Sequence, residues 1–273
     1  MDDRRAGAYQ WIWLLTDYGR RDGFAATCRG VIATIAPSAR VEDITHEVPA
    51  HDIRHGAAVL AQTVPYLPPA SIVVGIVDPG VGTSRRAVAL AAGEFVLVGP
   101  DNGLLLWAAD VLGGVSTAVE LTEAAYLLQR PSRTFAGRDV FAPVAAHLST
   151  GVPLDAFGPT LPVDRLIRLP APRVESHHGV LETDVLSVDR FGNVQLSATV
   201  ADLNTAGLDS GVVQISVGAR AYSSAVGATF GDVPLGDIVL LVDSAGHVAF
   251  AINGGDAATT LDLRPGDGVI LRR

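Results

Sequence analysis

Residues 71–82 read Ser71-Ile72-Val73-Val74-Gly75-Ile76-Val77-Asp78-Pro79-Gly80-Val81-Gly82, an apolar run that ends in an acidic, glycine-rich turn. Residues 10–15 and 95–98 form similar apolar runs without polar alternation, and Ala-rich stretches of helical spacing lie between such runs. Strands that are buried on both faces, as in a parallel sheet covered by helices, have this pattern. The sequence therefore predicts an α/β domain with a largely parallel sheet over residues 8–165.

The pattern changes in the second half of the chain. Residues 151–178 carry five prolines without a clear period, and we interpret residues 166–178 as a linker. Beyond it, apolar runs alternate with turns, as in residues 180–188 and 194–200 around the turn Asp189-Arg190-Phe191-Gly192-Asn193. Residues 179–273 are therefore predicted to form an all-β, barrel-like domain.

Composition excludes several classes of function. The 20 basic residues are all Arg and face 29 acidic residues, so the net charge of -9 disfavours nucleic acid and anionic membranes as partners. The lack of Lys excludes Schiff-base chemistry and a P-loop lysine, and the single Cys28 excludes an intrachain disulfide. Residues 1–5 contain four charged residues, and no apolar run is long enough to span a membrane, which predicts a soluble, cytoplasmic protein.

Three acidic residues directly follow predicted strands: Asp17, Asp78 and Asp101. The carboxyl ends of parallel strands share one edge of a sheet, where ligands bind, so we expect the three carboxylates to face one crevice. The alternative is that each Asp only caps a turn or a helix start.

Asp78 and Arg85 enclose a turn with glycines at 80 and 82, which lets Arg85 fold back toward Asp78. A guanidinium beside a carboxylate lowers its pKa, so this pairing predicts an ionised Asp78 with a depressed pKa. A purely structural ion pair at a strand end is the alternative.

A helix that begins near Ala142, with Pro143 in its first turn, would place Val140, Val144 and His147 on one stripe. His147 is thus predicted to face inward. An inward His is a candidate for proton transfer, and its alternative role is that of a hydrogen-bonded core residue.

Asp43, His46, His51, Asp52 and His55 could in principle ligate a metal. Their spacing matches no helical metal motif, and Pro49 interrupts any single helix through them. We expect no metal site, and a metal-dependent hydrolase that uses His46, His51 and Asp52 remains an alternative.

Seven short strings, in order along the chain, resemble the S-adenosyl-L-methionine hydroxide adenosyltransferase family, whose relatives include fluorinating and chlorinating adenosyl enzymes. The strings are Thr16-Asp17-Tyr18-Gly19 with Asp22-Gly23, Asp43-Ile44-Thr45-His46, Asp78-Pro79-Gly80-Val81-Gly82-Thr83, Pro100-Asp101-Asn102-Gly103, Phe135-Ala136-Gly137-Arg138-Asp139, Phe191-Gly192-Asn193 and Ser244-Ala245-Gly246. The resemblance implies an N-terminal α/β domain, a C-terminal β-barrel and a homotrimer with substrate sites at subunit interfaces.

The resemblance also implies roles for individual residues. Asp78, Arg85 and His147 match the catalytic triad of the water-using branch. Asp17 matches the carboxylate on the ribose hydroxyls, with Asp22 and Gly23 in the same loop. The remaining matches are Asp189 and Ser244 on the methionine side, and Phe191, Asn193, Asn253 and Gly254 on the adenine side.

The implied reaction is hydrolysis of S-adenosyl-L-methionine to adenosine and L-methionine by attack of water at the 5′ carbon, with no cofactor. In the halide-using relatives the position of Asp78 is not acidic, and the fluorinating enzyme has a serine where Gly137 stands. His51 and Ala245 depart from the fluorinating enzyme, which has tryptophan and arginine there. A halide-using adenosyl transferase and a non-catalytic adenosine or adenosylmethionine sensor are the alternatives.

Overall fold

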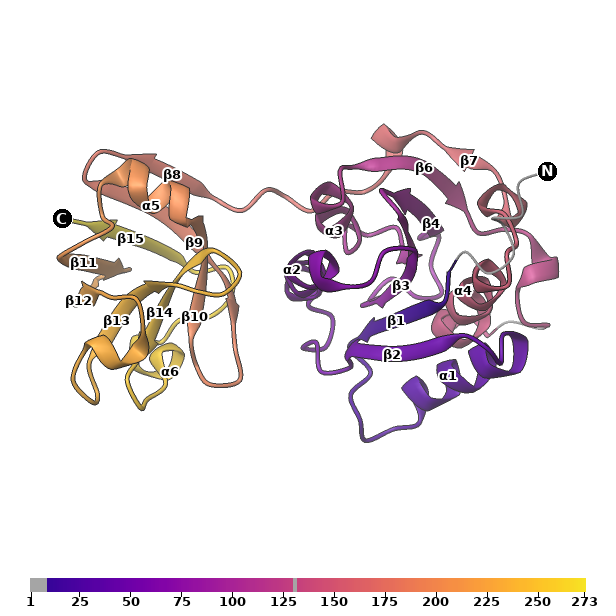
Figure 1. Ribbon diagram of the computed structural model, residues 1–273, viewed down its shortest axis with the longest axis horizontal. Coiled ribbons are helices and arrows are strands. Elements are labelled where there is room, and N and C mark those ends of the chain that lie inside the picture. Colours follow the sequence, from indigo (N-terminus) through magenta and orange to yellow (C-terminus); the bar gives the residue numbers. More distant parts are fainter. Residues whose placement is uncertain (1–8, 130–131) are drawn as a thin grey trace. The chain divides into compact units, whose positions relative to one another are not determined.

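The chain is described by a computed structural model that covers residues 9–129 and 132–273. It divides into two compact units, Met1–Leu169 and Pro170–Arg273 (Figure 1). Residues 1–5, on which part of the localisation prediction rests, and the predicted domain start at residue 8 lie outside the described residues.

The N-terminal unit is built on a seven-stranded sheet of order β2-β1-β3-β5-β4-β6-β7. Its first four strands in this order pair in parallel, while β4, β6 and β7 pair antiparallel. The α/β prediction with a largely parallel sheet is thereby confirmed. The strands are β1 (Trp11–Thr16), β2 (Arg40–Thr45), β3 (Ser71–Ile76), β4 (Ala87–Ala92), β5 (Phe95–Pro100), β6 (Val115–Glu120) and β7 (Thr160–Leu161).

Helices cover both faces of this sheet (Figure 1). Alternate residues of β1 show the two layers: Ile12 and Leu14 join the core beneath α1 (Phe24–Ile35) and α4 (Ala142–Ser149), and Leu15 joins the core on the other face. That second core includes residues of α2 (Ile53–Thr63) and α3 (Leu106–Val111). Burial on both faces explains why every residue of β3 is buried.

Helix α4 begins at Ala142 with Pro143 in its first turn, as predicted, since the missing N–H of proline costs no hydrogen bond there. A π-helical turn, Gly137–Phe141, leads into it. Short 3-10 helices occupy connections at Val64–Tyr66, Ala124–Tyr126, Leu154–Phe157, Val163–Arg165 and Phe230–Asp232.

The C-terminal unit is a closed barrel. Its sheet runs in the order β10-β14-β13-β12-β11-β15-β9-β8, and pairing of β10 with β9 closes seven strands on themselves. Leu181, Leu196, Ile215 and Phe250 are among the fully buried residues of its core. The strands and helices are β8 (Val174–His177), β9 (Val180–Val188), β10 (Val194–Thr199), β11 (Val212–Val217), β12 (Arg220–Val226), β13 (Ile238–Val242), β14 (His247–Ile252), β15 (Gly268–Arg272), α5 (Val200–Ala206) and α6 (Ala257–Leu261).

The stretch expected to be a linker, residues 166–178, contains packed structure. Leu166 is buried in the core of the N-terminal unit, and β8 pairs with β9 of the barrel. The two units therefore meet at Leu169 and Pro170 in the sequence.

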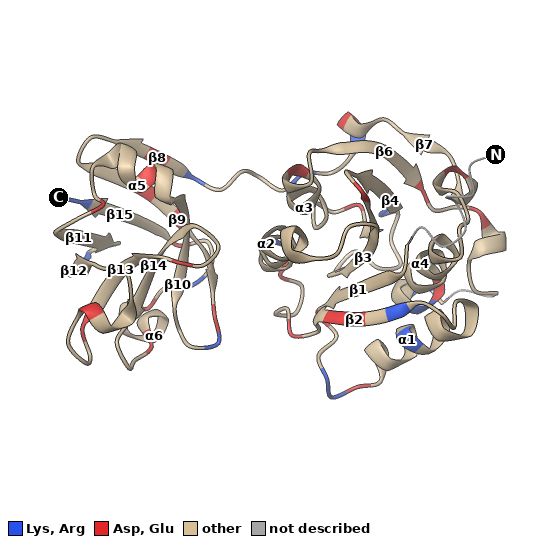
Figure 2. Ribbon diagram, viewed as in Figure 1, with Lys and Arg blue, Asp and Glu red and all other residues tan. Residues whose placement is uncertain are grey.

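Charged residues are interspersed over many elements of both units (Figure 2). Across the described ranges, none of the helices combines the length and apolar character that crossing a membrane requires.

Candidate active site

A cavity of about 260 Å³ opens at the carboxyl ends of the parallel strands. The loop after β1 supplies Asp17 and Tyr18, the loop after β2 supplies His51, and the turn after β3 supplies Asp78. Gly137, at the start of the π-helical turn, completes this rim. Two of the three strand-end carboxylates, Asp17 and Asp78, therefore line one cavity, as the strand-end pattern predicted.

Asp17 is tied to the neighbouring loop through its carboxylate. Its Oδ2 accepts a hydrogen bond of 2.9 Å from the backbone N–H of His51. His51 has a positive φ of 67°, which is unusual for a residue with a Cβ. This conformation aims the backbone N–H at Asp17, and such strain is typical of functional loops.

Asp78 and Arg85 form a two-pronged ion pair. Arg85 donates from Nε to Oδ1 at 3.1 Å and from Nη2 to Oδ2 at 2.5 Å. Little of either side chain is exposed, 6% for Asp78 and 11% for Arg85. Burial raises the pKa of Asp78, and Arg85 opposes this without reversing it. The predicted depressed pKa was therefore wrong, because loss of solvation outweighs the guanidinium.

Asp101 does not face the cavity with Asp17 and Asp78, contrary to the prediction. Its carboxylate accepts hydrogen bonds from Arg86 Nε at 2.9 Å and from the backbone N–H of Ile167 at 2.9 Å. Asp101 is 4% exposed, so these partners replace the water that it lost. This residue holds the turn after β5 to a distant loop and corresponds to the structural alternative.

His147 lies in the last turn of α4 and packs edge-on against the ring of Tyr126, with ring centroids 5.2 Å apart. Burial lowers the pKa of His147, which favours the neutral imidazole. Within residues 9–129 and 132–273, the His147 side chain forms no hydrogen bond with Asp78 or Arg85. The structure thus joins two of the three residues that the resemblance grouped as a triad.

An aromatic wall borders the cavity and was not singled out from the sequence. Tyr18, Phe24 and Phe135 pack together with ring centroids 5.2 to 5.8 Å apart. Tyr18 and Phe24 line the cavity itself. Their place beside Asp17 and Gly23 in the quoted motifs was the available signal. Asp22 and Gly23 are exposed, and Gly23 is the N-cap of α1.

Gly137 is in close contact with Tyr18. A Cβ at position 137 would lie 2.2 Å from the Tyr18 hydroxyl oxygen, well inside any van der Waals distance. The neighbouring rings of Phe24 and Phe135 hold the Tyr18 ring in place. Position 137 therefore accepts no side chain while Tyr18 keeps this conformation.

The predicted residues of the C-terminal unit lie in turns of the barrel. Asp189 accepts hydrogen bonds from the backbone N–H groups of Phe191 at 2.8 Å and Asn193 at 2.9 Å, and from Asn193 Nδ2 at 2.7 Å. The Phe191 side chain is 68% exposed. Asp189 thus fixes its own turn and presents an unusually exposed aromatic ring.

Two further turns carry the other predicted residues. Ser244 is exposed in the turn between β13 and β14, where Asp243 accepts the backbone N–H of Ala245 at 2.9 Å. Asn253 donates from Nδ2 to the carbonyl of Val233 at 2.8 Å, and Gly254 follows with a φ of 73°.

The His and Asp residues near position 50 have separate roles. Asp52 caps α2 by accepting the backbone N–H of His55 at 2.9 Å. His46 is buried in a hydrogen-bonded group with Thr16 and Asp43. Over the part of the chain that the structure describes, no group of three or more His, Cys, Asp or Glu side chains could hold a metal ion.

Comparisons with known proteins agree with this architecture. Residues 12–158 match the SAM hydroxide adenosyltransferase N-terminal domain, and residues 183–270 match the C-terminal domain of the same family. A protein named (R)-S-adenosyl-L-methionine hydrolase from Salinispora arenicola (strain CNS-205) is 56% identical over 258 residues, which cover 94% of this chain and 95% of that protein.

A solved structure and a more distant relative are also similar to this chain. The crystal structure of an uncharacterized conserved protein from Thermotoga maritima superposes with a TM-score of 0.91 at 35% identity, covering 96% of this chain and 100% of that one. A fluorinase from Actinoplanes sp. (strain N902-109) is 26% identical over 283 residues, which cover 93% of this chain and 95% of that protein. The chain belongs to the SAM hydroxide adenosyltransferase family.

Proposed function

We propose that this protein is an S-adenosyl-L-methionine hydrolase that forms adenosine and L-methionine. The observation that carries the proposal is the buried Asp78 carboxylate, which lines the cavity and is held by Arg85 through two hydrogen bonds. A fixed carboxylate accepts a hydrogen bond from water and repels a halide ion. The relatives at 39% to 56% identity named (R)-S-adenosyl-L-methionine hydrolase support the same reaction.

In the proposed reaction, the water oxygen forms a bond to the 5′ carbon while the bond from that carbon to sulfur breaks. The electron pair of the broken bond neutralises the sulfonium, so methionine leaves as a thioether. Asp78 accepts the proton of the attacking water, and its raised pKa makes it a stronger base than an ordinary Asp. Proton transfer of this kind contributes about 10² to 10⁴-fold, and the remainder comes from alignment and exclusion of water. His147 is proposed as the third member of this set.

The substrate contacts follow the family pattern. Asp17 would bind the ribose hydroxyls, because its carboxylate lines the cavity beside Tyr18, and Asp22 and Gly23 would lie along the adenosine. The barrel turns would bind the rest of the substrate: Asp189 and Ser244 the methionine ammonium and carboxylate, and Phe191, Asn193, Asn253 and Gly254 the adenine. The exposed ring of Phe191 is available for stacking on a base.

We further propose that the protein acts without a cofactor or a metal, in the cytoplasm, as a homotrimer with substrate sites at subunit interfaces. The single cysteine, Cys28, is buried, which is compatible with a reducing compartment. Sedimentation equilibrium of the purified chain measures the assembly, and a chelator control tests the metal.

The decisive experiment is incubation with S-adenosyl-L-methionine in oxygen-18 water, with and without chloride, followed by mass spectrometry of the products. Labelled adenosine and methionine are expected, whereas halogenated adenosine would indicate the halide-using branch. Binding without any product would indicate a sensor.

The matched variants are Asp78→Asn and Asp101→Asn, because both residues are buried at a strand end and paired with Arg. Asp78→Asn should abolish turnover, while folded Asp101→Asn should retain it. Equal activity of the two variants would remove Asp78 from the mechanism.

A further inference from the structure

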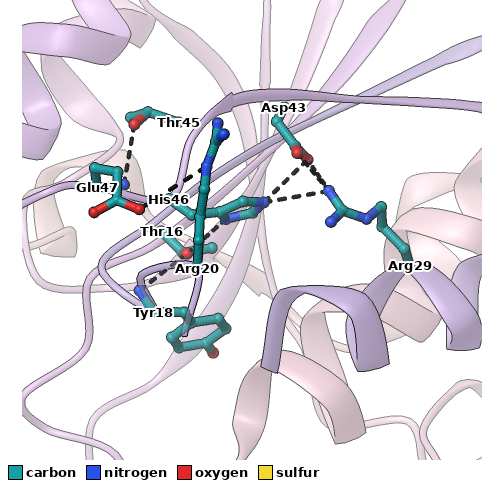
Figure 3. Close-up of polar contacts among 8 residues, drawn as sticks. All are labelled: Thr16, Tyr18, Arg20, Arg29, Asp43, Thr45, His46 and Glu47. Carbon is teal, nitrogen blue, oxygen red and sulfur yellow. Dashed lines mark hydrogen bonds and ion pairs between the residues drawn. The ribbon is translucent and has the colours of Figure 1, made fainter. Parts of the chain in front are cut away.

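A chain of hydrogen bonds runs from the loop after β1 through the buried His46 to the partly exposed Asp43 (Figure 3). The backbone N–H of Tyr18 donates to Thr16 Oγ1 at 3.1 Å, and Thr16 Oγ1 lies 2.8 Å from His46 Nδ1. His46 Nε2 lies 3.0 Å from a carboxylate oxygen of Asp43. Thr16 and His46 are each 2% exposed, so these contacts stand in place of water.

The donor and the acceptor in each of these hydrogen bonds follow from the groups at the two ends of the hydrogen-bond chain. Thr16 Oγ1 already accepts the Tyr18 N–H, and its own hydroxyl hydrogen needs an acceptor. If His46 donated from Nδ1, that hydrogen would find no acceptor among the described residues. The consistent arrangement has the hydroxyl donating to a bare Nδ1, and Nε2–H donating to Asp43. Arg29 Nη1 lies 3.4 Å from the same Nε2, farther than the Asp43 oxygen at 3.0 Å, and donates to Asp43 instead.

Asp43 is anchored in turn by α1. Arg29 contacts both carboxylate oxygens of Asp43. Burial raises the pKa of that carboxyl group, but the contacts with Arg29 and His46 together outweigh burial and lower it. An ionised Asp43 is a strong acceptor for the His46 Nε2–H. The far end of the chain is therefore a fixed charge.

The near end holds the loop that lines the cavity. Besides the Tyr18 contact, the backbone carbonyl of His46 accepts the N–H of Gly19 at 2.7 Å. Residues 17 and 18, which lie between Thr16 and Gly19, are the two cavity-lining residues of this loop. His46 thus restrains the loop through both its side chain and its backbone.

We propose that Thr16 and His46 are positioning residues, which hold the Asp17 carboxylate and the Tyr18 ring in the geometry that the reaction requires. The inference rests on the proposed function, since it assigns these residues to the same cavity. Displacement of reacting groups by about 1 Å can reduce a rate on the order of 100-fold. Loosening the loop that carries Asp17 and Tyr18 should therefore lower the rate measurably.

The test compares Thr16→Val with Thr45→Val. Thr45 Oγ1 accepts the backbone N–H of Glu47 at 3.0 Å, which is the same local contact outside the cavity (Figure 3). Thr16→Val should lower kcat about 10-fold or more and raise KM for S-adenosyl-L-methionine, while Thr45→Val leaves both unchanged. Thr16→Ser keeps the hydroxyl and should restore activity. The proposal would be overturned if Thr16→Ser were as impaired as Thr16→Val. It would also be overturned if Thr16→Val lowered the apparent kcat with KM unchanged, only because less of the enzyme is folded.

Two measurements on the free protein keep the test independent of turnover. Nitrogen-15 NMR of His46 should show hydrogen on Nε2 and none on Nδ1. Thr16→Val should accelerate amide exchange of Tyr18, which Thr45→Val should leave unchanged. If the wild type does not hydrolyse S-adenosyl-L-methionine, the proposed function fails, but these two measurements still test whether the hydrogen-bond chain holds the loop. A protonated Nδ1, or amide exchange of Tyr18 that is unchanged in Thr16→Val, would refute the positioning role of Thr16 and His46.

Discussion

The carboxylate of Asp78 is subject to two opposing influences, burial that raises its pKa and Arg85 that lowers it. If Asp78 is the base, kcat/KM should fall as pH drops through the pKa of this group in the free enzyme. This acidic limb should lie above the ordinary Asp value of about 3.9, since burial dominates. Arg85→Gln removes the charge that favours ionisation, so the limb should move to higher pH by about one unit or more. The measurement is kcat/KM against pH for both proteins, and an unmoved limb would assign it to another group.

The contact between Gly137 and Tyr18 predicts a coupled pair. Gly137→Ala should lower the free energy of unfolding by about 1–3 kcal/mol, because the new Cβ meets the Tyr18 hydroxyl at 2.2 Å. Tyr18→Phe removes that oxygen and should recover part of the loss. Urea unfolding of the two single variants and the double variant gives the coupling energy. Strict additivity would show that the hydroxyl is not what position 137 meets.

Individual cavity-lining residues were predictable where a strand end fixed their position. Asp17 and Asp78 follow buried parallel strands and line the cavity, whereas Asp101 follows a similar strand and turns inward to Arg86 and Ile167. Ile167 lies 66 residues further along the chain, so no local pattern could have revealed this partner. The sign of the Asp78 pKa shift was missed for a related reason, because burial is a property of the folded chain.

At the scale of elements, the turn between β9 and β10 depends on α6. Gly192 has a φ of 82°, and a Cβ there would lie 2.3 Å from the Asp256 side chain, which caps α6. Gly218, in the turn between β11 and β12, has a φ of 57° and open space around it. Both Gly→Ala changes should lower the free energy of unfolding by about 1–2 kcal/mol through left-handed backbone strain. Gly192→Ala should lower it by about 1–3 kcal/mol more, because its Cβ clashes with the Asp256 side chain. Chemical denaturation measures the free energy of unfolding of both variants. Equal decreases would contradict the close packing of this turn against α6.

Elements with a strong pattern were predictable, and those with a neutral composition were not. The continuous apolar run of β3 indicated a doubly buried strand, which the structure confirms. The sequence Ala-Val-Ala-Leu-Ala-Ala of β4 fits a helix equally well by propensity, yet it pairs antiparallel with β5 and β6. Strand β12 contains Arg220 and four small residues, two Ala and two Ser, so it shows no apolar run and owes its state to pairing with β11 and β13.

At the scale of the whole molecule, each unit has its own hydrophobic core, which predicts that the barrel folds alone. A chain of residues 170–273 should therefore show cooperative thermal unfolding. A chain of residues 179–273 lacks β8, which pairs with β9, and should unfold at a lower temperature. Circular dichroism of both chains is the measurement. Equal unfolding temperatures of the two chains would show that β8 adds no stability and that the folding unit begins at residue 179.

The change from helical to strand-and-turn periodicity was sufficient to predict two domains and the class of each. The boundary was harder to place, because β8 is short and directly follows the proline-containing residues 170–172. Its pairing with β9 is decided by the barrel rather than by its own residues.

Closure of the barrel through β9 and β10 also affects how this protein behaves when crowded. A strand with an unpaired side is a template on which another chain can add, which is how ordered aggregates grow. Over the described residues of the C-terminal unit, β8 alone ends the sheet, and it is only four residues long and carries Glu175. The open sheet ends in β2, which carries Arg40, Glu42 and Asp43, and in the two-residue β7. Among the described strands, those at the ends of both sheets are thus short or carry charged residues, which disfavours the addition of another strand, so concentrated samples should resist fibril formation.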